Sequence, residues 1–242
     1  AVPCESASEV ATNANIILLC LADGGAVADV VSDIHFLDAL SPDKLVLDLS
    51  SIPPDVTRSA AEMVEKSSGA KWVDAPVSGG VPGAEQGSLV IMAGGEESAI
   101  EKAKPVLAAI SKRVTRMGPI GAGQTTKLCN QIIVGCNIAA IAEAMRLAKA
   151  SNVDATLLPD ALAGGFADSL PFQIFGKRMA EDEETPVSIK IATMLKDLRG
   201  ALSAADQLGI NNPLTSKAAE LLQARCDRGD QERCITSLSE SS

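Results

Sequence analysis

Short apolar runs alternate with helical segments through the first half of the chain, and this alternation restricts the fold more than any other feature. Five segments rich in apolar and β-branched residues are predicted to be strands, namely 15–21, 44–51, 71–80, 88–95 and 112–118. The intervening segments 25–40, 55–69 and 96–111 have the apolar spacing of helices. Continuous apolar strands are typical of parallel sheets that are covered on both faces. The order therefore predicts an α/β fold with a doubly wound sheet.

The second half of the chain shows no further strand pattern. A long and mostly apolar helix is predicted at 118–150, and segments 154–165, 188–209 and 212–226 are helical by their period. The polar tail, 229–242, is expected to be loosely held. We therefore predict a partial dinucleotide-binding, Rossmann-like domain at 1–119. An all-helical domain at 120–242 should follow, beginning with a long interdomain helix.

A phosphate-binding glycine fingerprint is absent from this sequence. Dinucleotide-binding sheets usually begin with a strand, a GxGxxG turn and a helix, but none of these precedes the first predicted strand. The nearest pattern, Gly121-x-Gly123, lacks the third glycine and is followed by Gln124 where a P-loop has lysine. We therefore expect an incomplete Rossmann-like sheet that lacks the N-terminal glycine-rich βαβ unit.

Charge and cysteine content exclude several classes of function. A net charge of −10 argues against binding to nucleic acid or to anionic membranes, and no apolar run approaches the length of a membrane span. The six cysteines show no CxxC spacing, so neither a metal site nor a disulfide framework is expected. We expect Cys20, Cys129 and Cys136 to be buried as small apolar residues in a cytoplasmic protein.

The inventory of proton-transfer groups is small. The chain has no tyrosine, and its single histidine, His35, falls in a predicted surface helix. Histidine and tyrosine are common acid–base groups in enzymes. If the chain is an enzyme, its acid–base group is therefore expected to be a lysine or a carboxylate.

Three polar residues share one face of the predicted long helix. Lys127, Asn130 and Asn137 are spaced i, i+3 and i+10, in surroundings that are apolar nearly all round. A polar strip facing solvent is one interpretation. The other is a buried lysine, whose lowered pKa would suit a general acid–base. The pattern alone favours neither.

Two more segments place polar groups where parallel strands end. "DAPVSGG" (74–80) joins the strand-terminal Asp74 to a hydroxyl and two glycines whose backbone N–H groups suit a carboxylate or a phosphate. "DLSS" (48–51) ends another strand with two hydroxyls. Ligands of open α/β sheets bind at this edge. Taken alone, the first segment is more simply interpreted as an ordinary glycine turn, and Lys196–Asp197 as a surface ion pair.

Taken together and in order, four segments resemble the β-hydroxyacid dehydrogenase family. They are "DLSSIPP", "DAPVSGGVPGAEQGSLVIMAGG", "GAGQTTKLCNQ" and "KDLRGAL". This family includes 3-hydroxyisobutyrate dehydrogenase and 2-hydroxy-3-oxopropionate (tartronate semialdehyde) reductase. The resemblance implies NAD(P)-dependent hydride transfer between a small 3-hydroxy acid and its semialdehyde or oxo acid. It also implies a homodimer or homotetramer that binds a small carboxylate substrate.

The resemblance implies a role for each matching residue near the substrate. Lys127 would be the general acid/base, and Asn130 would hydrogen-bond the substrate beside it. Ser78, Gly79 and Gly80 would hold the substrate carboxylate.

Residues near the cofactor are implied in the same way. Leu21, Ala22 and Ser51 would border the nicotinamide and its ribose, and Lys196 would contact NAD or NADP from the helical domain. An alternative is a catalytically impaired, truncated family member that serves as a carboxylate-binding or dimerisation module. An imine reductase is a third possibility, which Lys127 disfavours.

Overall fold

The computed structural model describes residues 2–240, which form two compact units. The first is Ala1–Lys127 and the second is Leu128–Ser242. The division falls inside the long helix α7 (Ala122–Ala150), whose first six residues belong to the first unit. The predicted long helix is thus present, and the two units are described separately.

The first unit contains a six-stranded mixed sheet. Its strands are β1 (Ile16–Leu19), β2 (Leu45–Asp48), β3 (Lys71–Asp74), β4 (Val77–Ser78), β5 (Leu89–Gly94) and β6 (Ser111–Gly118). They follow the order β1-β2-β3-β5-β4, and β6 also pairs with β5. β1, β2 and β3 are parallel to one another, and β5 is parallel to β6 but antiparallel to β3 and β4. As predicted, the strand that begins at Lys71 ends at Asp74 and runs into the glycine turn. The short strand β4, which follows Pro76, was not predicted.

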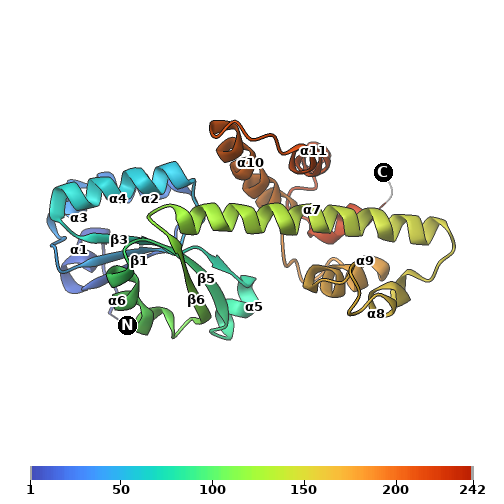
Figure 1. Ribbon diagram of the computed structural model, residues 1–242, viewed down its shortest axis with the longest axis horizontal. Coiled ribbons are helices and arrows are strands. Elements are labelled where there is room, and N and C mark those ends of the chain that lie inside the picture. The colour runs from blue at the N-terminus through green and yellow to red at the C-terminus, as the bar shows by residue number, and fades with distance from the viewer. Residues whose placement is uncertain (1, 241–242) are drawn as a thin grey trace. The chain divides into compact units, whose positions relative to one another are not determined.

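Helices cover both faces of this sheet, which confirms the predicted doubly wound α/β class (Figure 1). They are α1 (Ala7–Asn13), α2 (Gly24–Ser32), α3 (Ile34–Asp38), α4 (Pro54–Ser68), α5 (Gly80–Glu85) and α6 (Glu97–Leu107). Successive strand residues point to opposite faces. Val46 and Trp72 accordingly pack with α2, α3 and α4, whereas Leu47 and Val73 pack with α6.

Two local helix signals were missed in the sequence. The helix predicted at 25–40 is broken at Asp33, which ends α2 and caps α3 by accepting a hydrogen bond from His35 N at 2.9 Å. α1 precedes the first strand, where no helix was predicted. Ser6 caps it by accepting from Glu9 N at 3.1 Å, and the Glu9 carboxylate accepts from the Glu5 backbone N–H at 2.7 Å. This arrangement is close to a capping box.

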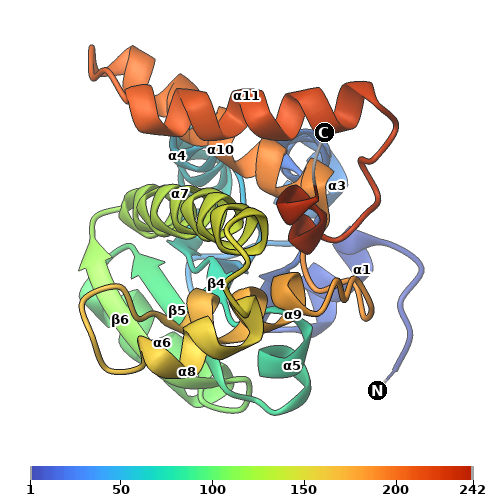
Figure 2. The same cartoon turned by 90° about the vertical axis from the view of Figure 1, so that its right-hand side faces the viewer.

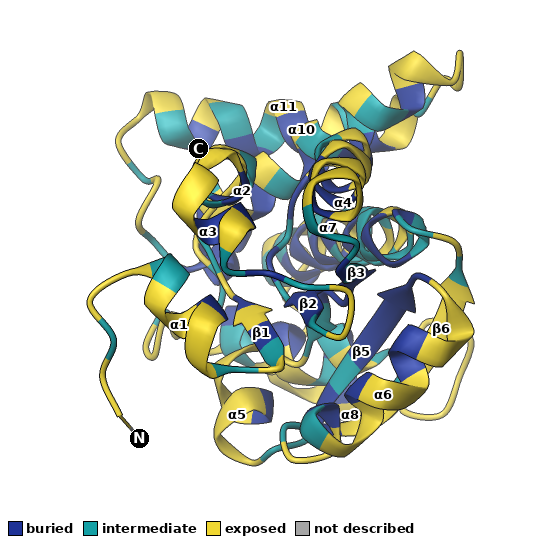
Figure 3. Cartoon of the chain, turned by 90° about the vertical axis from the view of Figure 1, so that its left-hand side faces the viewer, coloured by how far each residue is buried: buried dark blue, intermediate teal, exposed yellow. Residues whose placement is uncertain are grey.

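β1 forms one edge of the sheet (Figure 3). Within residues 2–240 it pairs only with β2, and its Leu18 side chain is 41% exposed. Cys20, just past the end of β1, is exposed, as is Cys129 on α7, and Cys136 is partly buried. The prediction that these three cysteines are buried is therefore wrong, because apolar neighbours in sequence do not fix which side of an element faces solvent.

The second unit is helical, as predicted. Its elements are the rest of α7, η1 (Ala155–Leu157), α8 (Leu158–Ala161), the π-helix η2 (Phe172–Gly176), α9 (Lys177–Ala180), α10 (Ile191–Gln207), α11 (Pro213–Asp227) and η3 (Ile235–Ser239). α10 and α11 lie on one side of α7 and α8 and α9 on the other (Figures 1 and 2). Gly135 permits close approach of α7 and α10, because a Cβ there would lie 2.9 Å from Leu198 Cδ2. Ile138, Met145 and Leu198 are fully buried in the core of this unit.

α7 is less enclosed than its composition suggests. Ile133 and Leu147 are 67% and 69% exposed, so the expectation of a helix buried all round is wrong. By length and composition it is the one helix among the described residues that could cross a membrane, so the expectation that no apolar run approaches that length is wrong. Its buried residues, among them Ile138, Ile141 and Met145, form the core of the second unit with α10 and α11, which accounts for its apolar composition.

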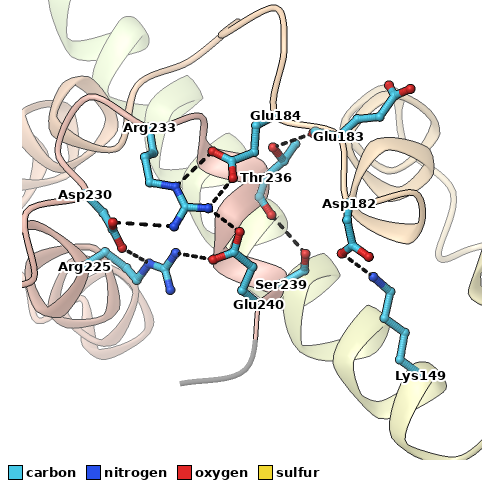
Figure 4. A network of polar contacts seen from close by, with 10 residues as sticks. All are labelled: Lys149, Asp182, Glu183, Glu184, Arg225, Asp230, Arg233, Thr236, Ser239 and Glu240. Atoms are coloured by element: carbon cyan, nitrogen blue, oxygen red, sulfur yellow. Dashed lines mark hydrogen bonds and ion pairs between the residues drawn. The ribbon is translucent and has the colours of Figure 1, made fainter.

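The C-terminal tail is packed rather than loose over its described part. Ile235 and Leu238, in η3, are 1% and 7% exposed. Arg233 forms ion pairs with Glu184 and Glu240, and Arg225 pairs with Glu240 at 3.1 Å (Figure 4). The expectation for 229–242 is thus wrong for residues up to 240, and the last two lie outside the described residues. Two apolar side chains and a set of partnered charges hold a segment whose composition is mostly polar.

Candidate active site

The start of α7 is held against the ends of β3 and β5. A Cβ at Gly123 would lie 2.4 Å from Met92 O and 2.7 Å from Asp74 O, so only glycine allows this approach. Gly121 has a φ of +88°, in the region that favours glycine. The Gly-x-Gly pattern therefore serves close packing and helix entry.

Asp74 caps this helix from another strand. Its two carboxylate oxygens accept hydrogen bonds from Gly121 N at 2.8 Å and Gln124 N at 2.9 Å. These N–H groups have no partner within the helix, and a negative charge there is favoured by the helix dipole. Burial raises the pKa of Asp74, while the hydrogen bonds from Gly121 and Gln124 oppose that rise.

Gln124 links the helix to the loop after β2. Its side-chain amide donates to Ser50 O at 2.7 Å and accepts from Ile52 N at 3.2 Å. Ser50 Oγ in turn accepts from Leu21 N at 2.9 Å. Hydrogen bonds thus run from the first turn of α7 to the loops that follow β2 and β1.

Lys127 lies one turn further along the helix. Its side chain is half-buried, and its Nζ donates to Val77 O at 3.0 Å. Val77 is in β4, directly before Ser78. The structure therefore brings the lysine and the "DAPVSGG" turn together, although 50 residues separate Lys127 from Val77.

The turn itself has a conformation that requires glycine. Gly79 and Gly80 have φ values of +137° and +61°, both in the region that side chains rarely adopt. A Cβ at Gly79 would also lie 3.1 Å from Leu89 Cδ2. Gly80 begins α5, and the first N–H groups of a helix have no intrahelical partner. Ser78 is half-buried beside them.

The remaining predicted polar residues lie in the second unit. Asn130 donates to Gln131 Oε1 at 2.8 Å, and Gln131 donates to Asp197 Oδ2 at 2.5 Å. Lys196 is 52% exposed, with its Nζ 3.6 Å from Asp197 Oδ1. Asn137 donates to Ser169 Oγ at 2.9 Å, so its role is local and structural.

The loops after β1 and β2 suit the nicotinamide end of a dinucleotide. The strands are parallel, and the bond from Leu21 N to Ser50 Oγ places their loops side by side. Ala22 is exposed and small, and the Ser51 hydroxyl makes no hydrogen bond within residues 2–240. A hydroxyl of this kind is a donor and an acceptor for a ribose. The fit concerns this half only, since the 242 residues contain no GxGxxG for the pyrophosphate.

A second buried carboxyl lies beside Asp74. Asp48 and Asp74 occupy paired positions on β2 and β3 and are both fully buried. Burial raises the pKa of Asp48 to about 6, with a further rise from Asp74, against the hydrogen bonds from Ser50. One of its oxygens, Oδ2, is buried without a hydrogen-bond partner within residues 2–240.

Gln124, Ser50 and Asp48 were not identified as site residues in the sequence. Of the two hydroxyls in "DLSS", the resemblance assigns Ser51, whereas Ser50 makes the link to Leu21. The available signal for Gln124 was an amide in the first turn of an apolar helix, three residues before a lysine. Its partners are 72 and 74 residues away, so no local pattern reveals them.

Comparison with known families covers nearly the whole chain. Residues 1–118 match the NAD-binding domain of 6-phosphogluconate dehydrogenase. Residues 121–239 match the NAD-binding domain of NADP-dependent 3-hydroxyisobutyrate dehydrogenase. The two matches support NAD or NADP as the cofactor.

Individual relatives agree with this assignment. The chain is 37% identical to 2-hydroxy-3-oxopropionate reductase of Escherichia coli, over 96% of the chain and 79% of that protein. It is 32% identical to the mitochondrial 3-hydroxyisobutyrate dehydrogenase of Drosophila melanogaster, over 92% of the chain and 70% of that protein. The structure of Mycobacterium tuberculosis 3-hydroxyisobutyrate dehydrogenase with L-serine superposes with a TM-score of 0.88 at 30% identity. That superposition covers 97% of this chain and 81% of the other.

These relatives are dehydrogenases and reductases, which disfavours a purely non-catalytic binding or dimerisation module. The four sequence segments, the observed fold and the coverage of both halves lead to one assignment. The chain belongs to the β-hydroxyacid dehydrogenase family of NAD(P)-dependent oxidoreductases.

Proposed function

We propose that the protein interconverts a small 3-hydroxy acid and its semialdehyde or oxo acid, with Lys127 as the general acid/base. One observation carries this proposal. The Lys127 amine is held 3.0 Å from Val77 O, one residue before the Ser78-Gly79-Gly80 turn. A proton-transfer group and a turn suited to a carboxylate are therefore adjacent in one compact unit.

The substrate carboxylate is proposed to bind at this turn. The Ser78 hydroxyl and the backbone N–H groups of Gly79 and Gly80 are hydrogen-bond donors, and the positive φ values of the two glycines allow the backbone to approach an anion closely. A carboxylate fixed at one end orients the reacting carbon at the other. Positioning of this kind contributes substantially to catalysis.

Lys127 is proposed to move the proton. Its amine lies beside the proposed carboxylate turn, because it donates to Val77 O, and an ammonium group can give a proton to a substrate oxygen. During reduction Lys127 gives a proton to the carbonyl oxygen, and during oxidation it accepts the hydroxyl proton. A nicotinamide cofactor bordered by Leu21, Ala22 and Ser51 would supply the hydride to the carbon in reduction and accept it in oxidation, so that both directions balance. The chain has no tyrosine, and its one histidine, His35, lies in α3. Neither residue type is therefore available for this role near the turn.

The roles of four further groups rest on the family resemblance. We propose that Leu21, Ala22 and Ser51 border the nicotinamide and its ribose, which agrees with the accessible hydroxyl and small side chain found there. Lys196 is proposed to contact the cofactor, which its 52% exposure permits. Asn130, which lies one turn after Lys127 on α7, is proposed to hydrogen-bond the substrate.

Substrate class, location and assembly are also proposals. The named relatives act on 2-hydroxy-3-oxopropionate and 3-hydroxyisobutyrate, so small branched or hydroxylated C3–C4 acids are the first compounds to assay. We propose a cytoplasmic homodimer or homotetramer that binds neither nucleic acid nor a membrane. The charge of −10 supports the last two exclusions.

Oxidation of NADH and of NADPH tests the proposal, both in this chain and in a chain to which an N-terminal glycine-rich βαβ unit has been added. Tartronate semialdehyde and methylmalonate semialdehyde are the first substrates. Lys127→Ala should lower kcat by roughly 10²–10⁴-fold, the usual contribution of a general acid–base. Lys127→Arg should lose a comparable amount, because arginine keeps the charge but does not release its proton.

Lys44→Ala is the matched control. Lys44 is also partly buried, belongs to the same unit and donates from Nζ to backbone carbonyls, including Thr12 O at 3.2 Å. It has no place in the proposed site, so its loss should leave kcat unchanged. Full activity in Lys127→Ala would refute the role of Lys127, and no turnover of any hydroxy or oxo acid would refute the function.

A further inference from the structure

A buried amide joins the helix that carries Lys127 to the loops proposed for the cofactor. The Gln124 side chain is 1% exposed and uses both of its polar atoms, as donor to Ser50 O at 2.7 Å and as acceptor from Ile52 N at 3.2 Å. The two backbone groups flank Ser51. One side chain therefore fixes the backbone on both sides of a residue proposed to border the ribose.

The same loop is tied to the first strand. Ser50 Oγ accepts from Leu21 N at 2.9 Å, and Ser50 N donates to Asp48 Oδ1 at 2.9 Å. The Gln124 backbone N–H is bound separately, by Asp74 Oδ2 at 2.9 Å. Gln124 is thus held through its main chain by β3, and its side chain in turn holds the loop after β2.

Lys127 lies about one helical turn after this anchor, at i+3, and residues so spaced lie on neighbouring positions of one face. Its amine makes a third attachment, to Val77 O in β4. The start of α7 is therefore fixed to the ends of β2, β3 and β4 by side-chain bonds from Gln124, Asp74 and Lys127. A shift of the helix would move the lysine relative to both the carboxylate turn and the Leu21 and Ser51 loops.

We infer that Gln124 is a positioning residue that sets the distance between the Lys127 amine and the nicotinamide loops without touching either reactant. The inference rests on the proposed function of Lys127. It differs from a merely structural role, in which Gln124 only satisfies two buried backbone groups. A misplacement of about 1 Å can lower a catalytic rate roughly 10²-fold, so a positioning role affects kcat more than binding.

Gln124→Met tests this inference, since methionine keeps the length but removes both hydrogen bonds. We expect kcat to fall roughly 10²-fold, with KM values for both substrates near those of the wild type. Thr57→Val is the matched control in the same unit. It removes a buried hydrogen bond of 3.1 Å from Trp72 Nε1 that includes none of the proposed site residues, and it should lower the melting temperature without lowering kcat.

Gln124→Glu gives a second measurement if the methionine variant does not fold. Only the protonated form of the introduced carboxyl can accept from Ile52 N and donate to Ser50 O together. The kcat of this variant should therefore fall as the pH rises through the pKa of that carboxyl. A pH profile equal to that of the wild type would overturn the inference, as would an unchanged kcat in Gln124→Met or an equal loss of kcat in Thr57→Val.

A readout without cofactor separates this inference from the proposed function. The rate at which an amine-acylating reagent modifies Lys127, followed by mass spectrometry across pH, reports the surroundings of its amine. Gln124→Met should shift this profile and Thr57→Val should not. If the wild-type protein turns over no substrate but the shift is seen, the function fails and the positioning stands. If it turns over substrate and no shift is seen, the positioning fails alone.

Discussion

Gly123→Ala perturbs the site through a single methyl group. The added Cβ would lie 2.4 Å from Met92 O, 2.7 Å from Asp74 O and 2.8 Å from Asp74 Oδ2. Two of these atoms belong to the backbone of β3 and β5, which cannot swing aside as the end of a flexible side chain can. Contacts below 3.0 Å are essentially never seen for real Cβ atoms, so the helix must withdraw by at least about 0.6 Å.

Two opposing effects set the loss of stability. Overpacking costs about 1–3 kcal/mol, and the greater helix propensity of alanine returns up to about 1 kcal/mol. We therefore expect the free energy of unfolding to fall by about 1–2 kcal/mol. The withdrawal also lengthens the bonds from Asp74 and carries Lys127 with the helix. A shift of this size should lower kcat by roughly 10-fold to 10²-fold.

Urea unfolding followed by tryptophan fluorescence and circular dichroism measures the stability. Trp72, the only tryptophan, is buried in β3 two residues before Asp74, so it reports on the unit concerned. Gly200→Ala is the control, because a Cβ in that α10 position would lie 3.7 Å from its nearest atom, Leu128 Cδ2. That variant should be as stable as the wild type or up to about 1 kcal/mol more stable. Wild-type stability and turnover in Gly123→Ala would refute the reasoning.

Two further variants test a buried charge and the packed tail. The pKa of Asp48 is raised to about 6 from 3.8, so its protonated form stabilises the folded state below about pH 4 and this stabilisation is lost as the pH rises through 6. The asparagine of Asp48→Asn does not titrate. In urea titrations, the free energy of unfolding of this variant minus that of the wild type should therefore increase by up to roughly 3 kcal/mol between pH 4 and pH 7. If the two free energies changed with pH in parallel, the burial of Asp48 would be contradicted. Ile235→Ala should cost about 2–5 kcal/mol in denaturant titrations followed by circular dichroism, because Ile235 is 1% exposed. A change below about 0.5 kcal/mol would mean that the tail is loose after all.

Much of the architecture could be predicted because its signals are local. The apolar runs around Ile17, Val46 and Ile91 and the period of the helices between them specify elements, and their order restricts how a sheet can be covered. The glycines at 79, 80 and 121 also carry information in themselves, since each occupies a positive φ. The helical pattern left Lys127 equally open to a structural and a functional interpretation, and the family resemblance favoured the functional one.

Other features depended on contacts that no local pattern encodes. The antiparallel pairing of β5 with β4 and the packed η3 are two examples, because each is decided by which distant segment offers a complementary surface. The polar tail was predicted loose from its composition, yet Arg233 finds Glu184, which is 49 residues away. The exposed face of α7 could not be predicted either, because the sequence of this helix is apolar on nearly every side.

The sequence by itself determined the alternation of most strands and helices, the helical second half and the family to which the chain belongs. Those properties follow from side-chain period, backbone sterics and motif identity, which act over a few residues. Only the tertiary structure decided that Lys127 reaches Val77, that Asp74 caps α7 and that Gln124 holds the Ser50 loop. These bonds join residues 50 to 74 positions apart, so they exist only once the sheet has brought the ends of its strands together.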